Sequence, residues 1–346
     1  MNSTDPPPKA PLIIALLLPV LGILVPLILA EIAVRLFSPR SPARWNDRPQ
    51  HYFIHENSTT LQDYPHSKEK EPDVFRVAVV GDSFTFAPYM QFDDAFPKRL
   101  ERWLNLNAEQ KKVEVINYGV PAYSTSHEAH VVKRAVEEKA DIIIMQITLN
   151  DPEIKPYTPT ELSRDKNRFG DLDLSRSSLR HSQLFSLIAR RLHNRSTRTH
   201  YTKKFFDLFE KNNTWWNFTG SWKSITKYSK KHNVPLVAVV FPLFGFEVDD
   251  SYPFWPIHQK IDKMLTNLQI PHLDITERFR NIPVERLQVL PGQDFHPNEI
   301  AHRIAAEEIY SWLSREKIIP ESLFAKLQYL ERVGINLTGA RYVETP

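Results

Sequence analysis

The chain opens on one long apolar stretch and then alternates between short apolar runs and amphipathic segments. Residues 11–30, PLIIALLLPVLGILVPLILA, carry no charge and as a helix are long enough to cross a hydrocarbon layer of about 30 Å. The stretch continues into EIAVRLF without the small-residue pattern of a signal-peptide cleavage site. We therefore predict a retained transmembrane anchor over residues 11–37, preceded by an N-terminal tail of residues 1–10.

The charges that flank this anchor do not settle its orientation. Lys9 precedes the apolar run, whereas Arg35, Arg40, Arg44 and Arg48 follow it. This bias favours a cytoplasmic location for the rest of the chain, but long domains translocate largely regardless of charge. The flanking residues alone leave the sidedness open.

Beyond the anchor, the pattern predicts a linker and then a sheet. Residues 38–72 are rich in proline and polar side chains, which is typical of a linker. The runs that follow are apolar on both faces, as parallel strands covered by helices are. Five such strands are predicted, at residues 75–80, 112–118, 141–148, 235–241 and 271–275.

Amphipathic segments separate these strands. Helices are predicted at residues 94–105, 125–140 and 298–314, the last with Asn298 as its N-cap. The alternation indicates a three-layer α/β/α domain over residues 73–318, built on a mainly parallel, five-stranded, flavodoxin-like sheet.

Residues 152–233 interrupt this alternation. They include a predicted helix at 181–195 and a cluster formed by Trp215, Trp216 and Trp222, and we predict an insertion that carries a lid or a substrate surface. The tail, residues 319–346, is predicted to be an extension with one helix at residues 322–333.

One part of the insertion is strongly basic. From Arg176 to Lys204 there are eight Lys or Arg residues and no acidic residue. A solvated helix face is the commoner explanation of such a run. The alternative is a site for an anionic polymer or for lipid headgroups.

Composition excludes several classes of site. The chain has no cysteine, so disulfides, thiolate metal sites and cysteine nucleophiles are ruled out. The net charge of +3 is too small to indicate a nucleic-acid partner. Neither glycine-rich phosphate loop, G-x-G-x-x-G or G-x-x-x-x-G-K, occurs, and HEAH at residues 127–130 lacks the spacing of H-E-x-x-H. We predict that HEAH lies on the solvent face of a helix, and we expect no cofactor and no metal.

Candidate chemistry gathers where the strands end. In VAVVGDSFTFAPYM, residues 77–90, Ser83 directly follows a strand, and Gly119 and Asn150 follow the next two. Ligands bind beyond the carboxyl ends of such strands. A serine nucleophile needs a base, which His296 could supply, and hydrogen-bond donors for the oxyanion.

Each of these residues also has a plain structural explanation. Serine and aspartate are common helix caps, and the hydrolase elbow G-x-S-x-G is absent because Thr85 replaces its second glycine. Gly119 could simply make a turn, Asn150 could cap a loop, and His296 could be a surface residue before Pro297. Together, however, the four positions favour a catalytic site.

The segments GDSFTF, NYGVPAYS, ITLND and DFHPN, in this order, resemble the successive motif blocks of the SGNH (GDSL-type) hydrolase superfamily. The resemblance runs from about residue 75 to residue 313. It implies that Ser83 is the nucleophile and His296 the base. It also implies that the Ser83 amide, the Gly119 amide and the Asn150 side chain form the oxyanion hole.

The sequence departs from the family pattern at the orienting acid. The family usually has an aspartate three residues before the histidine, where this chain has Gln293. Asp294, two residues before His296, is expected to take that role, and a main-chain carbonyl is the alternative.

The resemblance implies a membrane-anchored serine esterase or deacetylase that acts through an acyl-enzyme on an ester of a glycan or lipid. An O-acyltransferase of a cell-envelope glycan is one alternative. A second is a non-catalytic scaffold that binds a membrane-protein partner. The resemblance also places the domain on the extracytoplasmic face of a bacterial inner membrane, against the arginine bias, and no nucleic-acid partner is expected.

Overall fold

The structure is a computed structural model that describes residues 12–37, 62–106, 112–154, 177–179, 181–291 and 294–324. The chain divides into two units, one of residues 1–42 and 165–197 and the other of residues 43–164 and 198–346. The second unit contains the predicted α/β domain.

This domain is built on a parallel sheet with the strand order β2-β1-β3-β4-β5. The five strands are β1 Val74–Gly81, β2 Lys112–Gly119, β3 Ile142–Ile147, β4 Leu236–Val240 and β5 His272–Asp274. β3 and β4 are buried along their whole length, as expected for strands covered on both faces. The predicted five-stranded, flavodoxin-like sheet is therefore confirmed.

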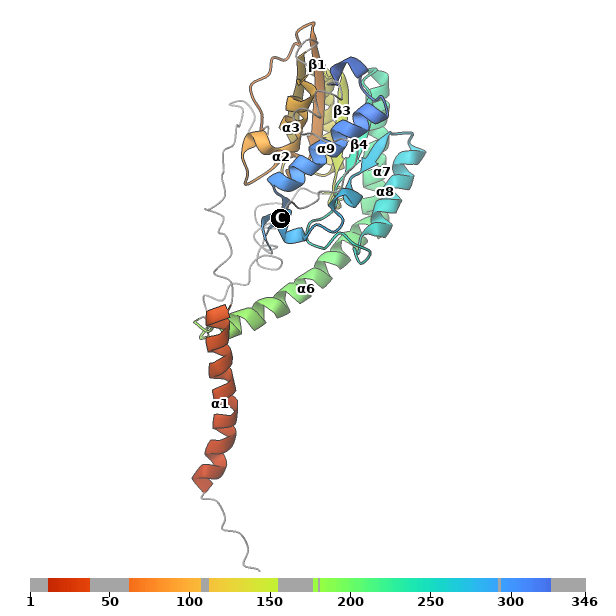
Figure 1. Ribbon diagram of the computed structural model, residues 1–346. Helices are drawn as coiled ribbons and strands as arrows, with labels where there is room; N and C mark the ends of the chain where they lie inside the picture. The colour runs from red at the N-terminus through yellow and green to blue at the C-terminus, as the bar shows by residue number, and fades with distance from the viewer. Residues whose placement is uncertain are drawn as a thin grey trace, which may run out of the picture. The chain divides into compact units, whose positions relative to one another are not determined.

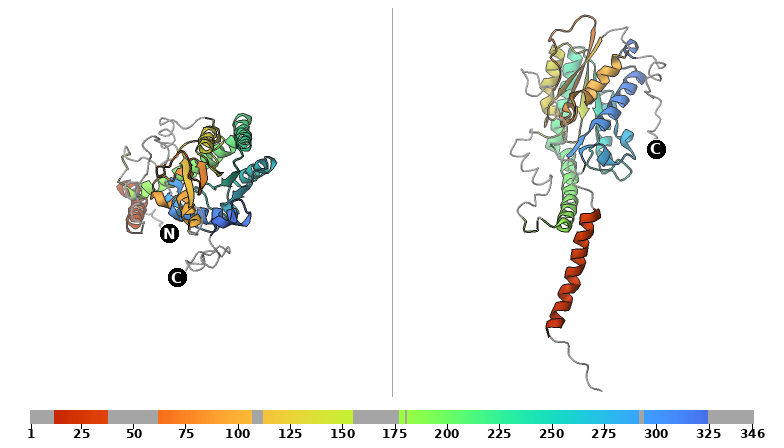
Figure 2. Two further views of the ribbon diagram at one scale, coloured as in Figure 1. Left: turned by 90° about the horizontal axis from the view of Figure 1, so that it is seen from above. Right: turned by 60° about the vertical axis from the view of Figure 1, so that its left-hand side comes forward.

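Helices cover both faces of the sheet (Figure 1 and Figure 2). α3 packs against α9 in one layer and α4 against α7 in the other. The helices are α2 Ser83–Phe86, α3 Phe96–Leu104, α4 Thr125–Glu137, α7 Asn212–Lys231, α8 Trp255–Asn267 and α9 Glu299–Arg315, with short 3₁₀ turns η2 Phe92–Asp94, η3 Thr276–Phe279, η4 Val284–Arg286 and η5 Glu321–Leu323. The three-layer architecture is thus confirmed as well.

The strand order places the candidate residues at one edge. The chain passes from β1 to β2 on one side and then returns across β1 to β3 on the other. The crevice of a doubly wound sheet lies at such a reversal, beyond the carboxyl ends of the strands. Gly81 and Gly119 are register partners at the ends of β1 and β2, so the turns that follow these two strands begin side by side.

The predicted insertion at residues 152–233 includes an ordinary part of the fold. α7 is the helix directly before β4, and it buries Phe218 and Trp222 completely. Of the three tryptophans, Trp216 alone is strongly exposed, at 67%. Much of the tryptophan cluster therefore serves the core and not a substrate surface, because the apolar positions of α7 recur at helical spacing.

The domain also extends beyond both predicted boundaries. Asp63, within the predicted linker, is buried, pairs with the Lys98 ammonium at 3.0 Å and accepts the Asn117 N–H at 2.6 Å. At the other end, Ile319 and Leu323 of the predicted extension are buried. Linker residues 38–61 and most of the predicted helix at 322–333 lie outside the described residues.

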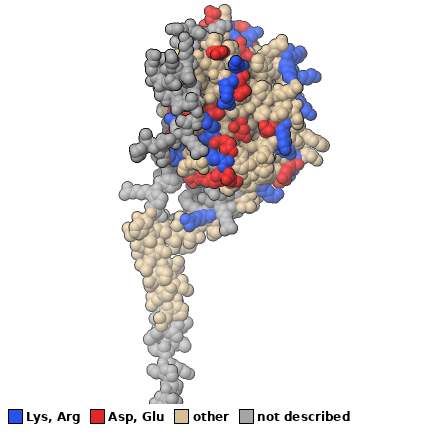
Figure 3. Space-filling model, turned by 45° about the vertical axis from the view of Figure 1, so that its right-hand side comes forward, with Lys and Arg blue, Asp and Glu red and all other residues tan. Residues whose placement is uncertain are grey.

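The other unit contains α1, Leu12–Phe37, and the first part of α6, Gln183–Glu210. The predicted anchor is therefore helical. Its stretch Leu18–Phe37 has a mean hydropathy of 2.3 and no burial within the chain. Figure 3 shows a long uncharged surface on this helix.

Candidate active site

The nucleophile and the base expected from the sequence lie in direct contact. Ser83 Oγ is 2.9 Å from Nε2 of His296, and Nδ1 of the same imidazole is 2.6 Å from Oδ1 of Asp294. Ser83 begins α2 directly after β1, whereas the other two residues belong to β7, Asp294–Pro297. The fold thus joins residues that are 213 positions apart in the chain into one line of hydrogen bonds.

Close packing at the end of β1 positions Ser83. A Cβ at Gly81 would lie 2.3 Å from both Gln146 Oε1 and Thr85 Oγ1, so only glycine allows this approach. Gln146 Oε1 accepts the Asp82 N–H at 3.2 Å and the Thr85 hydroxyl at 2.9 Å. Asp82 in turn caps α2 by accepting the Phe84 N–H at 2.8 Å.

His296 is held by a small sheet that was not predicted. β7 pairs antiparallel with β6, Gln288–Leu290. Immediately after β7, Asn298 caps α9 by accepting the N–H groups of Ile300 and Ala301, which confirms the predicted N-cap. The ring of Phe84 lies 5.7 Å from the imidazole, between centroids. The histidine is therefore fixed on its backbone side while 31% of its side chain stays exposed.

Two opposing effects determine the pKa of His296. Burial lowers this pKa, but the adjacent Asp294 carboxylate raises it more, and the charge of Asp82 adds to the rise. The pKa of the imidazole therefore lies above its ordinary value. In the neutral form with the proton on Nδ1, Nε2 can accept the proton of Ser83.

The side-chain amide of Asn150 is bonded to Asp82, the residue before Ser83. Its Nδ2 donates to Asp82 Oδ2 at 3.0 Å, and the same oxygen accepts the Thr148 hydroxyl at 2.8 Å. Because a side-chain amide has two N–H groups, one remains for another acceptor. The amide is thus held by Asp82, the residue directly before Ser83.

Gly119 is placed differently from its expected role. Its N–H donates to Asn117 Oδ1 at 2.9 Å, so this amide already has an acceptor. A Cβ at Gly119 would lie 2.2 Å from the backbone nitrogen of Phe86. The residue allows close contact between β2 and α2, and service as an oxyanion donor would require the bond to Asn117 to break.

Ala122, which the sequence did not single out, lies in the same turn. Its φ of 65° is left-handed, and its N–H has no hydrogen-bond partner among the described residues. The turn is held at both ends: the Val120 N–H donates to Gly81 O at 2.9 Å, and the Thr125 hydroxyl donates to Asp151 Oδ1 at 2.7 Å. The turn that contains Ala122 therefore lies between the ends of β1 and β3. A glycine here would have signalled the conformation, but alanine does not.

Two buried carboxyls lie behind these strand ends. Burial raises the pKa of Glu128 well above its ordinary value, and the nearby Asp151 and Asp82 carboxylates add to the rise. The pKa of Asp151 is raised by burial and by Asp82. The prediction that HEAH is a solvent face is therefore wrong at Glu128, which points into the protein with 1% exposure. Within the described ranges, no group of three or more acidic or histidine side chains is arranged to hold a metal.

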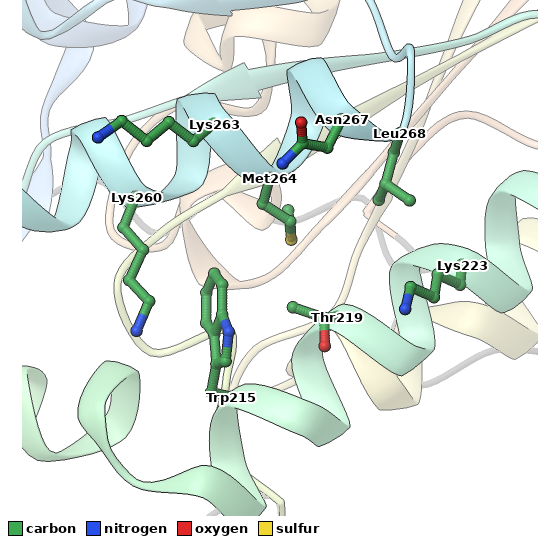
Figure 4. A pocket seen from close by; sticks show the side chains of 8 residues that line it. All are labelled: Trp215, Thr219, Lys223, Lys260, Lys263, Met264, Asn267 and Leu268. Carbon is green, nitrogen blue, oxygen red and sulfur yellow. The ribbon is translucent and has the colours of Figure 1, made fainter.

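A separate groove of about 380 Å³ lies between α7 and α8 and is lined by none of the candidate catalytic residues. Figure 4 shows Trp215 facing Lys260, whose ammonium lies 4.3 Å from the ring centroid. Lys223 and Lys263 also line the groove, which gives it a positive charge.

Comparisons with known proteins give distant matches in structure. No protein-family model and no curated protein matches the chain. Similar solved structures include the acetyl xylan esterase AlAXEase, at 14% identity, 69% coverage of this chain and 100% of that one, with a TM-score of 0.42. They also include the acetylxylan esterase Axe2 from Geobacillus stearothermophilus, at 12% identity, 70% and 93% coverage and a TM-score of 0.43.

A third match is the two-domain esterase CEX, active on acetylated mannans, at 12% identity, 73% coverage of this chain and a TM-score of 0.42. This chain spans 51% of the length of that two-domain enzyme. The interpretation of this site as catalytic rests on the contacts of Ser83, His296 and Asp294 and not on these similarities.

Proposed function

We propose that the chain is an SGNH-type serine ester hydrolase. The observation that carries the proposal is the continuous line from Ser83 Oγ through His296 to Asp294, with contacts of 2.9 and 2.6 Å. A serine with a hydrogen-bonded and oriented base is the arrangement that activates a hydroxyl for attack on an ester carbonyl.

Ser83 Oγ attacks the carbonyl carbon while its proton passes to Nε2 of His296. The tetrahedral oxyanion accepts hydrogen bonds from the Asn150 amide and the Ser83 N–H. The third donor is a backbone amide at or after the end of β2. It is either Gly119, as the resemblance implies, or Ala122, whose N–H lacks a partner among the described residues. The intermediate collapses to acyl-Ser83, and His296 returns the proton to the departing alcohol.

Water completes the cycle by the same route in reverse. His296 accepts a proton from water, the resulting hydroxide attacks the acyl carbon, and Ser83 leaves with the proton of the imidazole. An acyltransferase would replace this water with a sugar hydroxyl. Product analysis with an acetyl ester in the presence and absence of sugar acceptors separates the two.

Turnover of a generic acetyl ester by the purified full chain tests the proposal most directly. Hydrolysis and labelling by a fluorophosphonate probe are expected for the natural chain, with both lost in Ser83→Ala and His296→Ala. A well-folded natural chain without turnover or labelling would favour the scaffold alternative. Labelling that persists in Ser83→Ala would remove Ser83 from the site.

We also propose that α1 is a retained membrane anchor, which places the ester substrate, a glycan or a lipid, near a membrane. Length and hydropathy suit a span, although signal sequences share these properties. Retention is supported by the bonds of Glu31 and Arg35 to residues 181–184, because a cleaved segment would take these partners away. The chain should therefore resist carbonate extraction from membranes, and release into the soluble fraction would contradict the anchor.

An extracytoplasmic location in a bacterial inner membrane is the orientation we propose. The chain has no cysteine, so a single Lys230→Cys at an exposed position of α7 gives a clean reporter. A membrane-impermeant maleimide should label it in intact spheroplasts. Labelling only after lysis would assign the domain to the cytoplasm.

A further inference from the structure

We infer that the N-terminal part of α6 lies in the headgroup region of the membrane that α1 enters, with Leu184, Ile188 and Leu192 directed toward the lipid. The partner is the bilayer itself. This inference rests on the membrane anchoring proposed above.

The last part of α1 is bonded to the start of α6. The Glu31 carboxylate accepts the Ser182 hydroxyl at 2.8 Å, the Gln183 N–H at 2.9 Å and the Leu184 N–H at 2.8 Å. These amides belong to the first turn of α6, where unsatisfied N–H groups and the positive end of the helix dipole favour a carboxylate. One side chain of α1 thus caps the helix that begins about 150 residues later in the chain.

Arg35, one turn further along α1, strengthens the same contact. Its Nε donates to Glu31 Oε1 at 2.7 Å, and its Nη2 donates to the carbonyl of His181 at 2.6 Å. The Ser182 hydroxyl also accepts the Phe185 N–H at 3.1 Å. Two side chains of α1 and one serine therefore fix the start of α6 against the end of α1.

The length of α1 places this contact at the membrane boundary. The uncharged helix from Leu12 to Ala30 rises about 28 Å at 1.5 Å per residue, close to the ~30 Å of a hydrocarbon core. Glu31 is the first charged side chain after that rise. If α1 spans the bilayer, Glu31 and the helix start bonded to it lie where hydrocarbon gives way to headgroups.

The first part of α6 has the surface that such a position requires. Leu184, Ile188 and Leu192 recur every four residues and so share one face of the helix. Ile188 is 50% exposed and Leu192 65% exposed, so no described part of the chain covers them. Gln183 lies on the opposite side and is exposed as well. The helix therefore presents an apolar stripe that a bilayer can bury.

Charge favours lipid as the occupant of this surface. Arg191 is exposed beside the stripe, and residues 176–204 carry eight Lys or Arg and no acidic residue. Basic side chains next to an apolar stripe match anionic headgroups above acyl chains. Of the two explanations for this basic run, binding to lipid headgroups also accounts for the exposed Ile188 and Leu192, which a solvated face does not.

Depth measurement with nitroxide labels tests the inference on the full chain. Because the chain lacks cysteine, Ile188→Cys, its matched control Gln183→Cys and the anchor control Leu24→Cys each give one label. The variants are reconstituted in vesicles of phosphatidylcholine and phosphatidylglycerol. Collision rates with oxygen, which enters lipid, are compared with those of a neutral nickel chelate, which stays in water.

The label at position 188 should be open to oxygen and shielded from nickel, at a depth of about 5–10 Å, with position 183 more open to nickel. Equal nickel access at 188 and 183, with 24 shielded, would overturn the inference and leave the anchor intact. Nickel access at 24 would overturn the anchor and the inference together. Shielding of 188 from both reagents would show a protein cover in place of lipid, which also overturns it.

Discussion

Asp294 accepts two hydrogen bonds from His296, one from its backbone N–H at 2.8 Å and one from its imidazole Nδ1 at 2.6 Å. The two residues stand two apart in β7, and alternate residues of a strand share a face. This explains how an aspartate two positions before the histidine can orient it. The Asp294 carboxylate bridges the imidazole of His296 and the backbone N–H of the same residue. The alternative, a main-chain carbonyl that orients the imidazole, is therefore not needed at Nδ1.

The raised pKa of His296 predicts an acid limb in the pH profile of kcat/KM. The base must be neutral to accept the proton of Ser83, so activity rises as pH passes upward through this pKa. Because the Asp294 carboxylate outweighs burial, half-maximal activity should lie above the ordinary value of 6.5. Asp294→Asn should move the limb to lower pH and reduce the plateau by up to ~10⁴-fold. An unshifted limb in this variant would contradict the coupling.

Asn150→Ala should lower kcat by roughly 10²–10³-fold, the usual loss for one oxyanion donor. It also removes the bond to Asp82, so a stability loss of about 1 kcal/mol is expected alongside. Kcat and Tm measured on one preparation separate these effects. Asn213→Ala, an exposed position on α7, is the matched control and should leave both unchanged. Near-normal kcat in a folded Asn150→Ala chain would exclude the donor role.

Gly119→Ala should destabilise the domain, because the new Cβ would lie 2.2 Å from the Phe86 nitrogen and 2.6 Å from the Thr85 carbonyl carbon. Overpacking against backbone costs at least about 1–3 kcal/mol. Gly220→Ala on α7 is the matched control, since no atom outside the local backbone of its own helix and its chain neighbours lies within 4 Å of its Cβ position. There alanine should stabilise the helix by about 0.5–1 kcal/mol. Urea unfolding of both variants checks the contrast, and equal shifts would refute the packing role of Gly119.

His302 predicts a loss of stability in acid. Its Nδ1 accepts the Phe96 N–H at 3.1 Å, and burial lowers its pKa from 6.5 to about 3. The folded state keeps this imidazole neutral while the unfolded chain protonates it. Its stabilisation is thus complete above pH 6.5 and is lost as pH falls toward 3, by up to ~1.4 kcal/mol per pH unit. His302→Asn retains an acceptor and should flatten this part of the stability curve. An equally steep curve would contradict the assignment.

The sheet and its layers were predictable because parallel strands are apolar on both faces and the helices between them are periodic. β6 and β7 were missed because strands of three and four residues show no usable period. α7 was assigned to an insertion because its tryptophans resembled a binding surface. Trp222, however, is completely buried and fills the core, whereas Trp216 is 67% exposed.

The site was predictable in its residue types and less so in its backbone. Ser83, Asn150 and His296 follow or precede elements that the pattern locates. The direction of the Gly119 N–H toward Asn117 depends on a side-chain contact that no spacing encodes. Ala122 carries no sequence signal of its φ of 65°. The burial of Asp63 depends on Lys98, which is 35 positions away.

The buried carboxyl of Glu128 couples folding to the uptake of a proton from the solvent. Neither of its oxygens has a hydrogen-bond partner among the described residues, and its raised pKa means that the folded chain holds a proton that the unfolded chain releases. Folding between the ordinary pKa of 4.5 and the raised one must therefore take up a proton. Unfolding heats measured in two buffers of different ionisation enthalpy should differ accordingly. Glu128→Gln, which cannot titrate, should abolish the part of that difference that Glu128 causes and make the domain less sensitive to alkali.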